Sequence, residues 1–106
     1  MSHTDQSVFR ALADPTRRNI LRLLSDRDMT IAEVSENFDM TRAAVKKHLT
    51  ALSDGGLITV EPRGRERINR LDPAGFAPVI DWLNFFDRFW DTRLEALKTA
   101  IEKDHT

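Results

Sequence analysis

The sequence predicts a mainly α-helical protein with one small β-hairpin, and three observations support this prediction. Apolar residues recur at helical spacing in several short segments before residue 55. A β-branched stretch that contains a Pro and a Gly follows at about residues 57–71, and a long helical pattern then covers about residues 74–103. At 106 residues, the chain is expected to form a single domain over residues 1–106.

The composition is that of a folded globular protein, with 41% hydrophobic and 31% charged residues. There is no apolar run of membrane-spanning length and no basic-then-apolar leader, so we expect a cytoplasmic protein. The sequence contains no cysteine, which excludes disulfides, thiolate metal sites and thiol redox switches. We therefore expect no cofactor and no metal.

Two helices are predicted in the first quarter of the chain. Ser7–Leu12 is a short apolar-rich segment, and Asp14 can cap a second helix in which Pro15 takes the first position. The side chains of this second helix that we expect inside are Ile20, Leu23 and Leu24. Those that we expect outside are Arg17, Arg18 and Arg22. We interpret Arg17 and Arg18 as structural ion-pair partners.

Two further helices form a recognisable pair over about residues 30–55. The stretch Thr30–Glu33 fits a capping box, so a third, brief helix begins there. After a short turn Thr41 caps a fourth helix, and Gly55 or Gly56 supplies the left-handed residue that ends it. Two short helices joined by a tight turn make a helix-turn-helix pattern.

A β-hairpin is predicted directly after this pair, over about residues 57–71. Leu57–Val60 and Arg67–Leu71 are extended in pattern, and the charged stretch Glu61–Glu66 between them contains a Pro and a Gly. A hairpin in this position is a wing. Residues 41–71 carry a net charge of +4 although the whole chain carries −1, and a polyanion responds to the local field.

We interpret the cationic side chains of the fourth helix and the wing as DNA contacts, and the alternative is a merely solvated surface. Arg42 and Lys46 are candidates for contacts with base edges, and Ala43 for contact with a thymine methyl group. For His48 a partly packed position and a phosphate hydrogen bond both stay open. The expected DNA-binding residues are Thr41, Arg42, Ala43, Lys46, Lys47, His48, Thr50, Arg63, Arg65 and Arg67.

The C-terminal helical pattern at about residues 74–103 carries two apolar faces. A helix of about 28 residues is about 42 Å long, more than a domain of this size can cover. Large exposed apolar patches usually mark a partner, so we predict a dimerisation helix. A small-molecule pocket among the same aromatic residues stays open. The expected dimer interface consists of Val8, Phe9, Leu12, Trp82, Phe85, Phe86, Phe89 and Trp90.

Four stretches together resemble the ArsR/SmtB family of bacterial winged helix-turn-helix repressors. They are Ala11–Leu24 (ALADPTRRNILRLL), the block Thr30–Ile58, the wing with RGRERINRLDP (Arg63–Pro73) and DWLNFFDRFWDTRLEAL (Asp81–Leu97). The resemblance implies homodimers that bind operator DNA. It also implies that the helix over Thr41–Asp54 lies in the major groove and that terminal helices pair the subunits.

The sequence departs from the pattern of the metal-sensing members of that family. Those members carry a cysteine-containing motif in the third helix, or Asp/His and His/Glu ligand pairs in the last. Here Glu36–Met40 has no thiol, and the last helix has no histidine before His105, so we expect no metal sensing. A serine that the family often uses is replaced by Lys46, so no serine contact to DNA is carried over.

These observations predict a sequence-specific transcriptional regulator, most simply a homodimeric repressor that binds an imperfect palindromic operator. The alternative is a winged-helix module that binds protein and not DNA. No Ser/His/Asp grouping, phosphate-binding glycine loop or metal-ligand spacing points to an enzyme. The expected partners are double-stranded DNA and a second copy of the chain, with no membrane, and an unknown small-molecule effector stays open.

Overall fold

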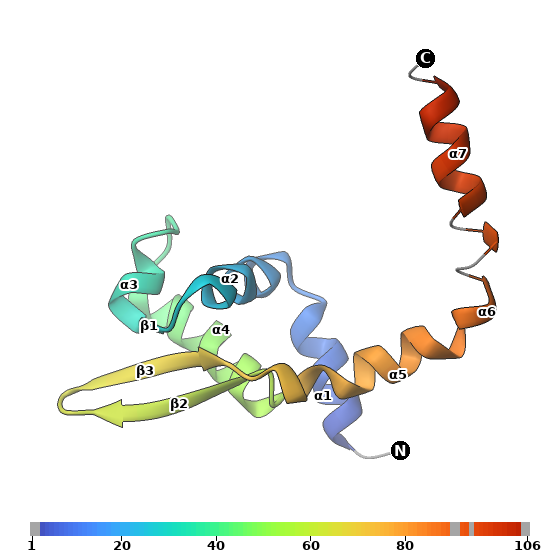
Figure 1. Ribbon diagram of the computed structural model, residues 1–106. Helices are drawn as coiled ribbons and strands as arrows, with labels where there is room; N and C mark the ends of the chain where they lie inside the picture. The colour runs from blue at the N-terminus through green and yellow to red at the C-terminus, as the bar shows by residue number, and fades with distance from the viewer. Residues whose placement is uncertain (1–2, 90–91, 94, 105–106) are drawn as a thin grey trace.

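Four helices and a small sheet form the body of the protein in the computed structural model, which describes residues 3–89, 92–93 and 95–104. The helices of the body are α1 (His3–Leu12), α2 (Pro15–Asp26), α3 (Ile31–Ser35) and α4 (Arg42–Asp54). The sheet strands are β1 (Met29–Thr30), β2 (Ile58–Arg63) and β3 (Glu66–Leu71). Figure 1 shows the β2–β3 hairpin, the wing, projecting from one end of the body and the C-terminal segment leaving from the other.

The amino terminus of α2 confirms the predicted cap. One carboxylate oxygen of Asp14 accepts hydrogen bonds from the backbone N–H groups of Thr16 (2.8 Å) and Arg17 (3.2 Å). These bonds satisfy donors that have no partner inside the helix. Inside the body the structure buries Leu21, whereas the predicted core residue Leu23 is only partly buried and packs against the core.

The helix-turn-helix pair is also capped as predicted. The Thr30 hydroxyl accepts from the Glu33 N–H (3.2 Å) and the Glu33 carboxylate accepts from the Thr30 N–H (2.9 Å), which is the reciprocal capping box. At the next helix, the Thr41 hydroxyl accepts from the Ala44 N–H at 3.1 Å. Both helices therefore begin where the sequence places them.

The chain leaves α4 through a glycine in the left-handed conformation. Gly56 has φ of 79°, so Gly56 rather than Gly55 supplies the left-handed residue. The Gly56 N–H donates to the carbonyl of Ser53 and the Leu57 N–H to that of Leu52, each at 3.0 Å. These two bonds make a Schellman motif, which ends the helix and directs the chain into the wing.

The strands of the wing extend further than the sequence indicates. Arg63 pairs with Glu66, so the connection is the two-residue turn Gly64–Arg65. Gly64 has φ of 62° and no non-glycine residue described in the structure has a positive φ, which fits a type II′ turn. Pro62 lies inside β2 without disrupting the ladder, because β2 is an edge strand in the order β1-β3-β2.

A third strand turns the predicted hairpin into a small sheet. β1 pairs antiparallel with β3 in the register Met29↔Asn69 and Thr30↔Ile68. The side chain of Asn69 is buried, and its amide nitrogen donates to the carbonyl of Met29 at 3.2 Å. The base of the wing is therefore attached to the residue pair from which α3 starts.

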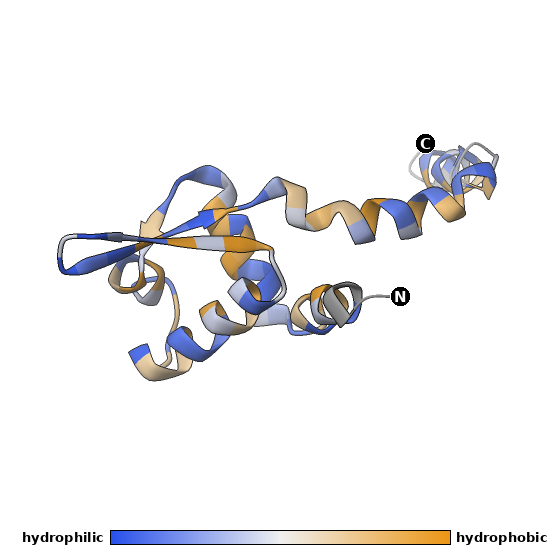
Figure 2. Ribbon diagram, turned by 90° about the horizontal axis from the view of Figure 1, so that it is seen from below, coloured by the Kyte–Doolittle hydropathy of each residue, from blue (hydrophilic) through white to orange (hydrophobic). Residues whose placement is uncertain are grey.

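One apolar core holds the body together. Its largest fully buried side chains are Val8, Ile20, Val34, Val45, Leu52 and Leu57. Full burial of an aliphatic side chain of this kind contributes about 1.5–3 kcal/mol. Val8, expected at a dimer interface, is only 1% exposed and belongs to this core, and Leu12 packs partly buried against it. Figure 2 shows that the outer half of the wing, in contrast, is hydrophilic.

The prediction of one continuous C-terminal helix is wrong. In the described part of the segment lie η1 (Pro73–Phe76), α5 (Ala77–Phe85), α6 (Asp87–Phe89) and α7 (Glu95–Asp104). At the end of α5 the Phe86 N–H donates to the Leu83 carbonyl at 3.0 Å, a bond over three residues instead of four. Asn, Phe and Asp, which make up residues 84–87, are weak helix formers.

A sequence of weak helix formers normally stays helical only where it packs against other parts of the protein. Here only the first part of the C-terminal segment packs against the body. α5 lies against α1, whereas α7 stands well away from the body in Figure 1. The predicted contributions of Trp90 and Leu94 to the apolar face lie outside the described residues. None of the described helices is long and apolar enough to cross a membrane.

Candidate nucleic-acid interface

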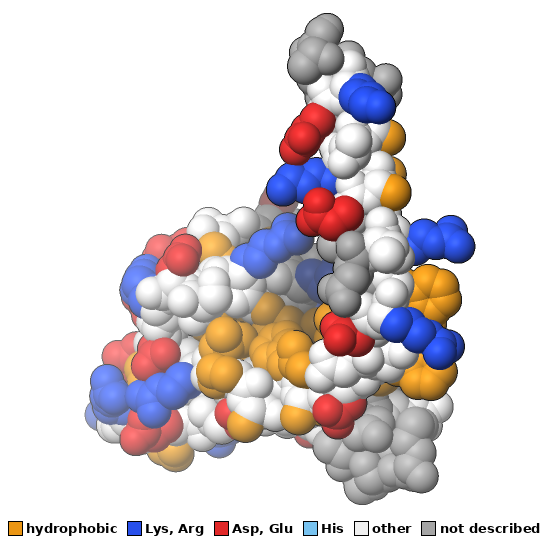
Figure 3. Space-filling model, turned by 45° about the vertical axis from the view of Figure 1, so that its right-hand side comes forward, with side chains coloured by type: hydrophobic (Ala, Val, Ile, Leu, Met, Phe, Trp, Pro, Cys, Tyr) orange, Lys and Arg blue, Asp and Glu red, His pale blue; other side chains and the backbone are white. Residues whose placement is uncertain are grey.

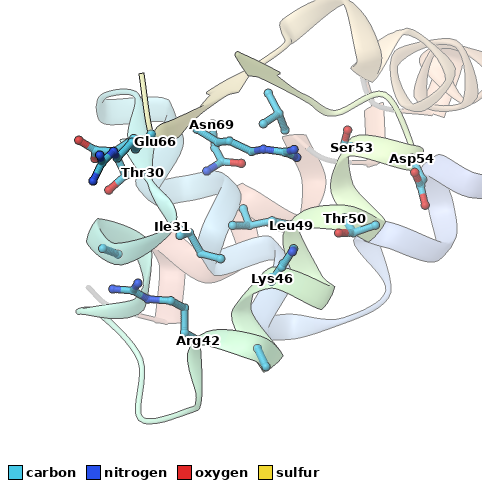
Figure 4. A pocket seen from close by; sticks show the side chains of 15 residues that line it. Thr30, Ile31, Arg42, Lys46, Leu49, Thr50, Ser53, Asp54, Glu66 and Asn69 are labelled. Carbon is cyan, nitrogen blue, oxygen red and sulfur yellow. The ribbon is translucent and has the colours of Figure 1, made fainter. Parts of the chain in front are cut away.

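An open groove of about 810 Å³ lies between α4, the start of α3 and the wing. Figure 4 shows Arg42, Lys46 and Thr50 following one another along the side of α4 that borders it. Their i, i+4, i+8 spacing puts them on one helix face. The wing contributes Val60, Arg65, Glu66, Arg67 and Asn69, and the start of α3 contributes Thr30, Ile31 and Ala32.

Four cationic side chains border the groove without an anionic partner among the described residues. Within the described part of the chain, none of them takes part in an ion pair. They are Arg42, Lys46, Arg65 and Arg67, all exposed. Two carboxylates, Asp54 and Glu66, also line the groove, so cations outnumber anions there. Unpaired cations along a concave surface attract a polyanion.

The opposite face of the wing carries paired charges instead. The Arg63 guanidinium lies 3.7 Å from the Glu61 carboxylate. Arg70 contacts both Asp28 (2.9 Å) and Glu61 (3.4 Å), and the hydrogen bond to Asp28 raises the pKa of Arg70. The three predicted wing arginines are thus not equivalent, because Arg65 and Arg67 face the groove and Arg63 belongs to this ion-pair network.

Two arginines of α2 donate hydrogen bonds to backbone carbonyls of α1. Arg17 donates to the carbonyl of Arg10 at 3.4 Å, and Arg18 donates to that of Leu12 at 2.7 Å. The ion pairs predicted for Arg17 and Arg18 do not occur among the described residues, although both side chains are structural. Backbone carbonyls at the end of a helix are natural acceptors for guanidinium groups.

The half-buried side chain of His48 contacts the body. Its Nδ1 atom accepts a hydrogen bond from Nε of Arg17 at 3.2 Å. Burial tends to raise the pKa of the nearby Asp14 carboxyl, but hydrogen bonds from the backbone N–H groups of Arg17 and Thr16, together with the positive charge of Arg17, outweigh this effect and lower that pKa. His48 therefore has a partner within the chain at a place where the sequence left a phosphate contact open.

Six of the ten predicted DNA-binding residues line the groove, namely Arg42, Ala43, Lys46, Thr50, Arg65 and Arg67. Thr41, Lys47 and Arg63 are exposed but lie outside its lining, and His48 is turned to the body. The sequence did not indicate Thr30, Ile31 or Asn69 as part of this surface. The capping box at Thr30 predicts the start of α3 but not that this start borders the groove. Asn69 comes to the groove through its pairing with Met29, which is a contact between residues distant in the sequence.

A second surface is apolar and lies where the C-terminal segment meets the body. The ring of Phe9 on α1 contacts Trp82 on α5 edge to face, with centroids 6.0 Å apart. Trp82 also contacts Phe86, the residue after α5, edge to face at 5.3 Å. Trp82 is nevertheless 55% exposed and Phe85 71% exposed. Figure 3 shows hydrophobic side chains gathered at this junction. So much exposed aromatic surface is typical of an interface.

Comparisons by sequence place the chain among transcription factors. Residues 12–61 match the family model described as a helix-turn-helix domain. The chain is 33% identical over 97 residues to the HTH-type transcriptional regulator Rv2034 of Mycobacterium tuberculosis, covering 92% of this chain and 88% of the relative. It is 34% identical over 83 residues to the transcriptional repressor SdpR of Bacillus subtilis, covering 77% of this chain and 92% of that protein.

Comparisons of structure agree with those of sequence. The crystal structure of the ArsR family transcriptional regulator RHA00566 matches with a TM-score of 0.76 and 35% identity, over 84% of this chain and 98% of that one. The solution structure of a homodimeric winged helix-turn-helix DNA-binding domain from Mycobacterium bovis has the same fold. Its TM-score is 0.66 at 22% identity, over 82% of this chain and 81% of that one.

Proposed function

The chain belongs to the ArsR family of winged helix-turn-helix transcriptional regulators, and on this basis we propose that it is a homodimeric repressor of an imperfect palindromic operator. Like its relatives, which are transcriptional regulators, it is a regulator and not an enzyme. Repression is proposed because SdpR, which it resembles over most of its length, is a repressor. The repressor acts by occupying promoter DNA and excluding polymerase.

The observation that carries this proposal is the groove, where four cationic side chains form no ion pair with any residue that the structure describes. α4, the recognition helix, enters the major groove of B-DNA, which is wide enough to admit a helix. Arg42 and Lys46 then face base edges from its first two turns, and Ala43 faces a thymine methyl group. Arg65 and Arg67 hold phosphates from the wing, on the same side of the protein.

Homodimerisation is proposed on the exposed aromatic surface of α1 and the C-terminal segment. Phe9, Trp82, Phe85 and Phe89 are 39–71% exposed in the single chain, and a second copy would cover them. The related fold from Mycobacterium bovis is itself a homodimer. Two-fold symmetry would place two recognition helices about 34–36 Å apart, one turn of DNA, so that each reads one half-site.

Selection from a random DNA pool tests the proposal. We expect the protein to enrich an inverted repeat whose half-site centres are about 10–10.5 base pairs apart. Sedimentation of the purified complex should give two protomers per site, and the site placed across a reporter promoter should lower transcription when the protein is present. Enrichment of no sequence, together with no salt-dependent DNA binding, would overturn the proposal in favour of a protein-binding winged helix.

A further inference from the structure

We infer that Arg17 and His48 are positioning residues of the DNA-reading surface, whose hydrogen bond sets the rotation of α4 relative to α1 and α2. The inference rests on the proposed function, because it concerns how the recognition helix is held and not whether DNA is bound. Neither side chain lines the groove, and the bond joins residues 31 positions apart in the sequence.

The position of His48 on α4 separates it from the DNA-facing side chains. At 100° per residue, His48 lies about 160° around the helix from both Lys46 and Thr50. It shares its side of the helix with the buried residues Val45 and Leu52. A side chain there cannot reach the bases that Lys46 reaches, so its polar atom acts on the body of the protein.

Arg17 joins three helices through two donors. Nε donates to His48 on α4 at 3.2 Å, and Nη1 donates to the carbonyl of Arg10 on α1 at 3.4 Å, while Arg17 itself belongs to the first turn of α2. α1 also carries Phe9, whose ring contacts Trp82 on the proposed dimer surface. Arg17 therefore links the helix that reads DNA to the helix that borders the dimer partner.

This link affects specificity more than general affinity. Base readout needs both recognition helices to meet their half-sites in the correct orientation, whereas phosphate contacts tolerate small rotations and depend mainly on charge. Loss of the hydrogen bond would leave the cations of the groove in place and only loosen the orientation of α4. Binding of the operator would then weaken while binding of unrelated DNA would not.

The chemistry of the bond provides a conservative substitution. Nδ1 of His48 accepts from Arg17, so this nitrogen carries no proton. In His48→Asn the amide oxygen occupies the place of Nδ1 and can accept the same bond. His48→Leu fills similar space without an acceptor, and Arg17→Lys keeps the positive charge but lacks the Nε donor.

The experiment measures dissociation constants of wild type and variants on the selected operator and on scrambled DNA over a range of salt concentrations. His48→Leu and Arg17→Lys should each weaken operator binding about three- to tenfold, the effect of one hydrogen bond, with scrambled DNA and the salt slope nearly unchanged. His48→Asn should bind like wild type. The double variant His48→Leu with Arg17→Lys should be no weaker than the weaker single variant.

Thermal unfolding of each variant checks that it is folded, and Arg17→Lys tests the link without altering the half-buried His48. Additive losses, or losses on both DNAs with a smaller salt slope, would show direct phosphate contacts and overturn the inference. Wild-type affinity for the operator in His48→Leu and Arg17→Lys would overturn it as well. Failure of wild type to prefer any operator is a different result, because it removes the proposed function itself.

Discussion

The backbone of Gly75 lies directly against Gly56, so that a Cβ atom on Gly75 would meet the carbonyl oxygen of Gly56. Gly56 ends the recognition helix, and Gly75 lies in η1, from which the C-terminal segment starts. The Asp72 N–H donates to the Leu57 carbonyl at 2.9 Å beside this contact. The end of the DNA-reading helix and the start of the proposed dimer segment are therefore fixed to each other by backbone.

Substitution Gly75→Ala should destabilise the protein by about 1–3 kcal/mol, because the added methyl group meets backbone that cannot rotate away. Chemical denaturation followed by circular dichroism measures this change. The exposed neighbour Ala74 offers a control, since Ala74→Ser adds one atom without such a contact. Equal stability of Gly75→Ala and wild type would mean that η1 does not rest on the end of α4.

Acid should weaken the fold in part through the cap of α2. The pKa of Asp14 is lowered in the folded chain, so the stability that it contributes is complete above its ordinary value, near 4, and is lost as pH falls through the folded pKa. Asp14→Asn keeps a good cap without a titrating group. Its unfolding free energy should therefore fall less than that of wild type between pH 5 and about pH 2, and parallel curves would contradict this role of Asp14.

The aromatic surface should hold the dimer. Phe85 and Phe89 are 71% and 41% exposed in the single chain, so Phe85→Glu or Phe89→Glu should weaken dimerisation and operator binding together without unfolding the body. Analytical ultracentrifugation and DNA binding on the same samples measure both. Asn84→Glu adds the same charge at an exposed polar position and should have little effect. A monomer that still binds a palindrome tightly would contradict the dimer.

Metal ions should not act as specific inducers. The chain has no cysteine, and no group of three or more His, Asp or Glu side chains that could hold a metal occurs within the described ranges. Micromolar zinc, cadmium or arsenite should therefore leave the protein on its operator, as fluorescence anisotropy with a labelled duplex can show. Release of the DNA by such a metal, with light scattering excluding precipitation, would be incompatible with this prediction.

The starts of the helices were predictable because their signals are local. Asp14, Thr30 and Thr41 each cap a helix through a bond to a backbone N–H two or three residues further on, which a sequence shows directly. β1 has two residues, too few for any alternation to be visible. The continuity of the last helix was not predictable, since apolar spacing does not tell whether packing will keep residues 84–87 helical.

The candidate site was predictable where charge and helix spacing define it, and not where side chains from distant segments meet. Arg42, Lys46, Arg65 and Arg67 come together as the wing pattern indicates. The pairing of Arg63 with Glu61 on the other face depends on the register of the hairpin, which sets which side chains share a face. The bond of His48 to Arg17 depends on how α2 crosses α4, for which the sequence holds no local signal.

In the proposed complex α4 and the wing bind one DNA duplex in different ways. The most direct test is a salt titration of binding to operator and scrambled DNA by wild type, Arg42→Ala, Lys46→Ala and Arg65→Ala. The two helix variants should lose about 1–3 kcal/mol on the operator and relax preference at one position of each half-site. Arg65→Ala should weaken both DNAs alike and reduce the salt slope by about one unit for each lost phosphate contact. If all three variants bind both DNAs as wild type does, the groove is only a solvated surface and does not bind DNA.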